Sequence, residues 1–207
     1  LLIGDSWAHF MWFDHAMSDV MTERGLGHYS EENAALGGTK ASQWGVVGGI
    51  NNTAFFQLQN FPSIDTVFVT LGGDDIMYGE PMNWFEFVEV NGIENEGVFF
   101  NQIADGIVVC VQQYLDYRPD MRVVVCGYDY MNAIKKANAL DGKEVCDLTP
   151  AEALARNQYV NAIMVRCEQV IADHLKAMDR VYFVNNYGVL HHYLGYPGPN
   201  PPAWLAP

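Results

Sequence analysis

The sequence has few positive charges: 11 Lys and Arg stand against 25 Asp and Glu in 207 residues, which gives a net charge of −14. Nucleic acids and anionic membrane surfaces are bound through clusters of Lys and Arg, so this balance argues against both as partners. No apolar run approaches the ~18 residues that a membrane-spanning helix needs. Because half of the residues are hydrophobic and 13% are aromatic, the chain has enough apolar surface to form a packed domain.

The chain also lacks the C-x-x-C spacing that zinc sites and redox motifs use. The sequence does not decide whether its four cysteines form two disulfides or remain free thiols. They are Cys110, Cys126, Cys146 and Cys167. The sequence begins without Met inside an apparent strand, so we expect an N-terminal stretch, with any targeting segment, to be missing. Its acidity suits a secreted or extracytoplasmic protein.

Apolar runs alternate with segments of helical periodicity along the chain. Strands are expected at 1–3, weakly at 28–30, and within "SIDTVFVTLGGDD" (63–75), "MRVVVCGYDY" (121–130) and "RVYFVNNY" (180–187). Helices are expected from about Phe10 to Gly25, over 98–117, and within "LTPAEALARNQYVNAIMVRCEQVIADHL" (148–175), whereas 42–60 is ambiguous. This order predicts a three-layer α/β/α domain over residues 1–190, with a five-stranded parallel sheet. Residues 191–207 form a proline-rich C-terminal segment.

Polar and glycine residues follow three of the predicted strands. They are Gly4–Ser6, Gly72–Asp75 and Tyr128–Tyr130. Ligands of parallel sheets bind at the carboxyl ends of the strands, so we expect the site at this edge.

Ser6 has two interpretations. A serine between a strand and a helix can attack an acyl carbon while nearby N–H groups bind the oxyanion that forms. Serine is also an ordinary helix N-cap. The first ten residues do not separate the two.

Two glycine-rich stretches have similar alternatives. The pair in "NAALGGTKASQW" (33–44) permits close backbone approach to a ligand, or forms a plain loop before a helix. In "LGGDDI" (71–76), Asp74 and Asp75 could hold a divalent cation, cap the next segment or face a substrate.

Taken together, the three stretches resemble the motifs of the SGNH (GDSL-type) esterase and lipase family, in their usual order. Its first block is similar to Gly4–Ser6, its second to Gly38 with the residues around it, and its third, Gly-x-Asn-Asp, to Gly72–Asp75. The resemblance implies a flavodoxin-like fold with Ser6 as nucleophile and with Gly38 and Asp74 on the oxyanion side. Asp5, Gly73 and Asp75 would then lie at the pocket.

The chain departs from this family at two points. Asp74 replaces the asparagine that donates to the oxyanion, and an ionised carboxylate cannot donate. No histidine has an aspartate three residues before it, which is the spacing of the family's general base. His191 and His192 follow the last predicted strand and are possible pocket residues. The resemblance implies that an Asp-x-x-His block and a final helix would follow beyond Pro207.

The function implied is hydrolysis of carboxylic esters through an acyl-enzyme, as in an esterase, lipase or acetylesterase. The substrate would be a small-molecule ester, a lipid or an acylated glycan, and neither a metal nor an organic cofactor is expected. The alternative is a non-catalytic binding or structural module on the same fold. A metal-dependent hydrolase that uses Asp5, Asp74 and Asp75 is a further alternative.

Overall fold

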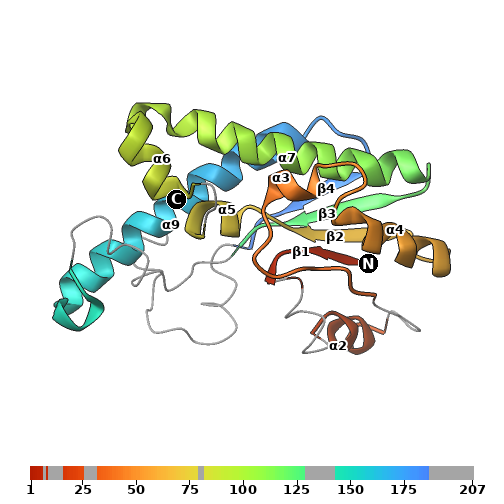
Figure 1. The fold of residues 1–207 in the computed structure, drawn as a ribbon. Helices are drawn as coiled ribbons and strands as arrows, with labels where there is room; N and C mark the ends of the chain where they lie inside the picture. Colours follow the sequence, from red (N-terminus) through yellow and green to blue (C-terminus); the bar gives the residue numbers. More distant parts are fainter. Residues whose placement is uncertain (7, 9–15, 26–31, 79–81, 129–142, 187–207) are drawn as a thin grey trace.

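The computed structural model describes residues 1–6, 8, 16–25, 32–78, 82–128 and 143–186. Within these residues, four parallel strands form one sheet in the order β1-β2-β3-β4 (Figure 1). The strands are β1 (Leu2–Gly4), β2 (Thr66–Thr70), β3 (Arg122–Cys126) and β4 (Val181–Val184). Because all four run the same way, their carboxyl ends meet at one edge.

The prediction of five strands was wrong for the part of the chain that is described. Residues 28–30 lie outside it, and the segment that follows them makes a single parallel bridge, between Asn33 and Leu2. The Asn33 side chain accepts a hydrogen bond from the N–H of Ala35 at 2.9 Å. The segment nevertheless runs beside β1 over residues 32–36. The N–H of Leu2 donates to the carbonyl oxygen of Glu32 at 2.8 Å, and the N–H groups of Ala34 and Leu36 donate to the carbonyl oxygens of Leu2 at 2.9 Å and Gly4 at 2.8 Å, without forming a regular strand.

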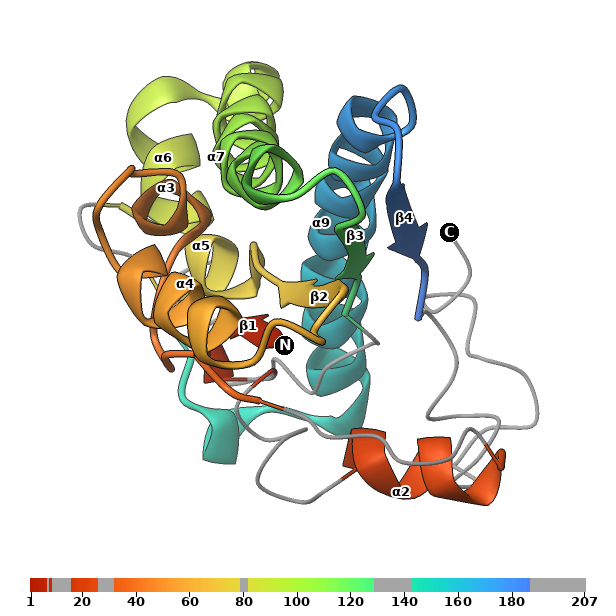
Figure 2. The same cartoon turned by 90° about the vertical axis from the view of Figure 1, so that its right-hand side faces the viewer.

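Helices cover one face of the sheet, and α2 lies on the other side (Figures 1 and 2). The helices, with two short 3-10 turns, are α2 (Ala16–Glu23), α3 (Ala41–Trp44), α4 (Asn51–Asn60), α5 (Gly73–Met77), α6 (Trp84–Asn91), η1 (Ile93–Asn95), α7 (Glu96–Tyr117), η2 (Val145–Asp147) and α9 (Pro150–Leu175). The predicted α/β class with a parallel sheet is therefore confirmed.

The two long helices were both predicted. Helix α7 begins two residues before the expected 98–117 segment and ends where that segment ends. Helix α9 has the expected capping box: Thr149 accepts from the N–H of Glu152, whose carboxylate accepts from the N–H of Thr149 at 2.9 Å. Local residues alone define this helix start, which is why the sequence was sufficient.

The ambiguous 42–60 stretch forms two helices, α3 and α4. Glycines separate them, and Gly48 has a φ of +79°, which is a left-handed conformation that interrupts a helix. Trp44 at the end of α3 is fully buried, as its size favours.

One hydrophobic core lies between the sheet and the helices. Alternate residues of β2 and β3 point into it, such as Val67, Val69, Val123 and Val125. Among the described helices, none is long and apolar enough to cross a membrane. All four cysteines are free thiols. The C-terminal segment, 191–207, lies outside the described residues.

Candidate active site

The carboxyl ends of β1 and β2 are held together by their backbones. The N–H of Asp5 donates to the carbonyl oxygen of Thr70 at 3.0 Å. A Cβ at Gly4 would lie 2.0 Å from the same oxygen, and Gly4 has a φ of +126°. Both facts require glycine, because an L side chain fits neither the space nor the backbone angle. The contact fixes where the chain leaves β1 and therefore where Ser6 lies.

Ser6 is half-buried and already helical, so the cap position before it belongs to Asp5. Within the described part of the chain, the Ser6 hydroxyl has no hydrogen-bond partner, and it is available to a ligand.

The glycine loop of residues 36–39 packs against this turn. The N–H of Leu36 donates to the carbonyl oxygen of Gly4 at 2.8 Å. The Thr39 hydroxyl lies 2.6 Å from the carbonyl oxygen of Leu36 and accepts from the indole N–H of Trp44 at 2.8 Å. The buried side chain of Trp44 thus holds the loop against the start of α3.

The two glycines of this loop have different surroundings. A Cβ at Gly37 would lie 3.5 Å from the Cβ of Ser6, so Gly37 is the glycine in contact with the serine. Gly38 has a φ of +77°, and nothing described lies within 4 Å of its Cβ position. Gly38 therefore faces open space one residue from the contact.

The third predicted stretch forms a turn into α5. Gly72, with a φ of +113°, precedes this helix, and both Asp74 and Asp75 are buried in its first turn. The carboxylate of Asp75 accepts from the N–H of Ala41 at 3.0 Å, which ties the turn to the start of α3.

Burial raises the pKa of Asp75 from 3.8 to about 6. The Ala41 N–H and the positive charge of Lys40 oppose this rise, and the charge of Asp74 adds to it. The Lys40 side chain is itself largely buried, and its ammonium donates to the carbonyl oxygen of Met82 at 3.3 Å.

Asp5 is fully buried, and its carboxylate accepts hydrogen bonds from two hydroxyls. Thr70 donates to one oxygen at 3.4 Å, and the phenol of Tyr128 donates to the other. Sequence reasoning placed Tyr128 at the sheet edge but gave it no role. The position after a predicted strand was the signal that could have identified it.

The remaining residues predicted for the pocket are two histidines. His191 and His192 lie outside the described residues. Among the described histidines, His174 donates from Nδ1 to the carbonyl oxygen of Val170 at 2.8 Å, and its Nε2 lies 3.6 Å from the carboxylate of Asp105, so it bridges α9 to α7. Among the described residues, no three His, Cys, Asp or Glu side chains form a group that could hold a metal ion.

No protein-family model matches the sequence, and no curated protein matches it. Among solved structures, the chain is similar to one described as "a putative platelet activating factor from Streptococcus pneumonia". The two are 14% identical and superpose with a TM-score of 0.51, over 94% of this chain and 68% of that chain. At this identity, the likeness establishes a shared fold.

Proposed function

We propose that this protein hydrolyses carboxylic esters through a covalent acyl-enzyme on Ser6, in the manner of SGNH-type hydrolases. The observation that carries the proposal is the contact of the glycine loop with Ser6. A Cβ at Gly37 would lie 3.5 Å from the serine Cβ, at the carboxyl edge of the sheet. A half-buried serine beside a glycine loop has space for an acyl group and backbone N–H groups near the reacting carbon.

In this mechanism, the Ser6 hydroxyl oxygen attacks the ester carbonyl carbon, and its proton passes to a general base. The tetrahedral intermediate then expels the alcohol and leaves an acyl-serine, which water hydrolyses. The N–H groups of Ser6 and Gly38 would stabilise the oxyanion. For the base, the sequence offers His191 and His192 after the last strand, both outside the described residues.

Asp74 is the main departure of this sequence from the residues that SGNH-type hydrolases use for this reaction. It is buried in the first turn of α5, where the family has an asparagine. In its protonated form the carboxyl donates a hydrogen bond as an amide does, and burial favours that form. The proposal therefore assigns Asp74 to the oxyanion side as a neutral acid.

The fold supports the proposal, since the chain superposes on a solved structure described as a putative platelet activating factor. A small-molecule ester, a lipid or an acylated glycan fits the proposed reaction. Asp5, Asp74 and Asp75 do not favour a metal-dependent hydrolase, because the carboxylate of Asp5 is engaged by Tyr128 and Thr70.

Labelling with a fluorophosphonate tests the nucleophile. We expect intact-mass spectrometry to show one adduct on the folded protein, mapped to Ser6, and hydrolysis of p-nitrophenyl acetate. Ser6→Ala should abolish the adduct and lower kcat by at least about 10³-fold. Ser42→Ala is the matched control, because Ser42 is an exposed serine on α3. A folded wild-type protein that neither reacts nor hydrolyses the ester would favour the non-catalytic module instead.

A further inference from the structure

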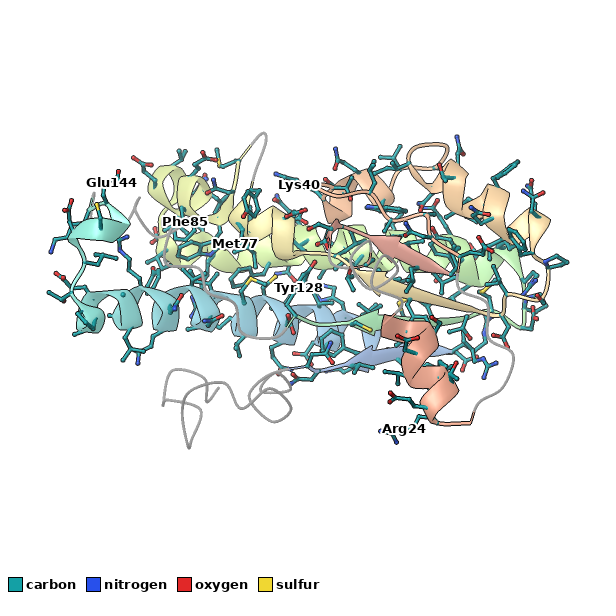
Figure 3. All side chains as sticks on the ribbon, turned by 90° about the horizontal axis from the view of Figure 1, so that it is seen from below. Arg24, Lys40, Met77, Phe85, Tyr128 and Glu144 are labelled. Carbon is teal, nitrogen blue, oxygen red and sulfur yellow. The ribbon has the colours of Figure 1, made fainter. Side chains whose placement is uncertain are left out.

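Tyr128 lies just after β3, and its side chain, which is only 6% exposed, lies in the interior of the molecule beside α9 (Figure 3). Its phenol donates to the carboxylate of Asp5, the residue that immediately precedes Ser6. This hydrogen bond joins positions 123 residues apart in the sequence. It connects the turn that carries the nucleophile to the end of a different strand.

The same phenol also lies against Gly73, the residue before Asp74. The ring packs so closely there that a Cβ at Gly73 would lie 2.7 Å from the ring carbon that bears the hydroxyl. Hence the second glycine of "LGGDDI" makes room for Tyr128. One side chain thereby contacts both the Ser6 turn and the turn that precedes Asp74.

Tyr128 is itself held by its backbone. Its N–H donates to the carboxylate of Glu168 on α9 at 2.6 Å, and Glu168 is 3% exposed. The N–H of Gly127 donates to the carbonyl oxygen of Val184 at 2.9 Å. Because the backbone is tied to both α9 and β4, the ring has a defined position from which to hold the two turns.

We infer that Tyr128 is a positioning residue, which sets the distance between the Ser6 turn and the Asp74 turn because its hydroxyl is bonded to Asp5 and its ring packs against Gly73. The inference rests on the proposed function. Tyr128 does not serve as an acid or base: burial, followed by the charge of Asp5, raises its pKa well above the ordinary value for tyrosine, so the phenol keeps its proton.

Tyr128→Phe tests the inference, because it removes only the hydroxyl. A misplaced nucleophile lowers turnover more than binding, so we expect kcat for p-nitrophenyl acetate to fall about 10- to 100-fold, with KM changed less than about threefold. Fluorophosphonate labelling of Ser6 should slow in parallel. Hydrogen exchange of the Gly73 amide, measured by NMR, should become faster.

Tyr114→Phe is the matched control. Tyr114 is fully buried on α7, and its hydroxyl donates to the side chain of Asn51 at 2.6 Å, away from Ser6. Both substitutions remove one buried hydroxyl, so both should lower the unfolding midpoint. The control should leave kcat and the Gly73 exchange unchanged.

A second variant, Gly73→Ala, keeps the inference testable if Tyr128→Phe does not fold. Gly73→Ala keeps the hydroxyl but displaces the ring, and it should reproduce the loss of kcat. If the wild type is active while Tyr128→Phe keeps the kcat of Tyr114→Phe, the inference is overturned and the proposed function stands. If the wild type is inactive, the proposed function and the kinetic role fail together. Unchanged Gly73 exchange in Tyr128→Phe would overturn the linkage itself.

Discussion

The carboxylate of Asp75 accepts a hydrogen bond from the backbone N–H of Ala41 at 3.0 Å, in a buried position between α5 and the start of α3. Ala41 follows the glycine loop that contacts Ser6, so this bond joins two of the three stretches that form the candidate site. The bond is made to a carboxylate whose ionisation burial disfavours. Stability should therefore depend on pH at this position.

Asp75→Asn should reveal that dependence. The pKa of Asp75 is 3.8 in a model peptide and about 6 in the folded protein. Below about 4 the carboxyl is protonated in both the folded and the unfolded chain, and its contribution to stability is fully present. Between about 4 and 6 only the unfolded chain loses the proton, so stability falls as the pH rises, by on the order of 2–3 kcal/mol. Urea unfolding at a series of pH values measures the difference between wild type and Asp75→Asn.

Asp65→Asn supplies a comparison in which stability should depend on pH in the opposite direction. A hydrogen bond from the Thr66 hydroxyl, together with the neighbouring Arg122, lowers the pKa of Asp65. Its contribution is therefore present at higher pH and is lost as the pH falls through the folded pKa. Wild-type and Asp75→Asn curves that stay parallel from pH 4 to 7 would contradict the assignment for Asp75.

Two glycines of α7 predict opposite effects of the same substitution. A Cβ at Gly106 would lie 3.0 Å from backbone atoms of Ala41 and Ser42, whereas nothing described lies within 4 Å of the Cβ position of Gly97. Gly97→Ala should stabilise the protein by up to about 1 kcal/mol, since alanine favours the helix. Gly106→Ala should destabilise it by about 1–3 kcal/mol, because α3 must move away. Equal free energies of unfolding for the two variants would show that α3 does not pack as described.

The parts of the fold that were predictable depend on local residues or on the direction of the strands. The start of α9 needs only Thr149, Pro150 and Glu152, which are adjacent in the sequence. The contact between the ends of β1 and β2, where the N–H of Asp5 donates to the carbonyl oxygen of Thr70, follows from the parallel sheet, because parallel strands end at one edge. Neither inference requires knowledge of side-chain packing.

The parts that were not predictable depend on distant contacts or on competing local bonds. The link from Tyr128 to Asp5 depends on the register of three strands and on how the ring fits over Gly73. Residues 32–36 lie beside β1 without forming a regular strand, and the residue pattern did not show this pairing. The composition of the glycine pair could not show that Gly37, instead of Gly38, contacts Ser6.

Asp74→Asn bears most directly on the chemistry. An amide donates to an oxyanion, whereas an ionised carboxylate repels it, and one such donor is worth about 10²–10³ in kcat. Because the proposal makes Asp74 a neutral acid, Asp74→Asn should preserve kcat; a rise of up to about 100-fold would show that Asp74 is ionised in the wild type. Steady-state hydrolysis of p-nitrophenyl acetate measures the change.

The control is Asp74→Ala, which removes both the charge and the donor, so its kcat should not exceed that of Asp74→Asn. A large fall in kcat for Asp74→Asn, with the unfolding midpoint unchanged, would show that the reaction needs the carboxylate and that Asp74 does not take the place of the family's asparagine.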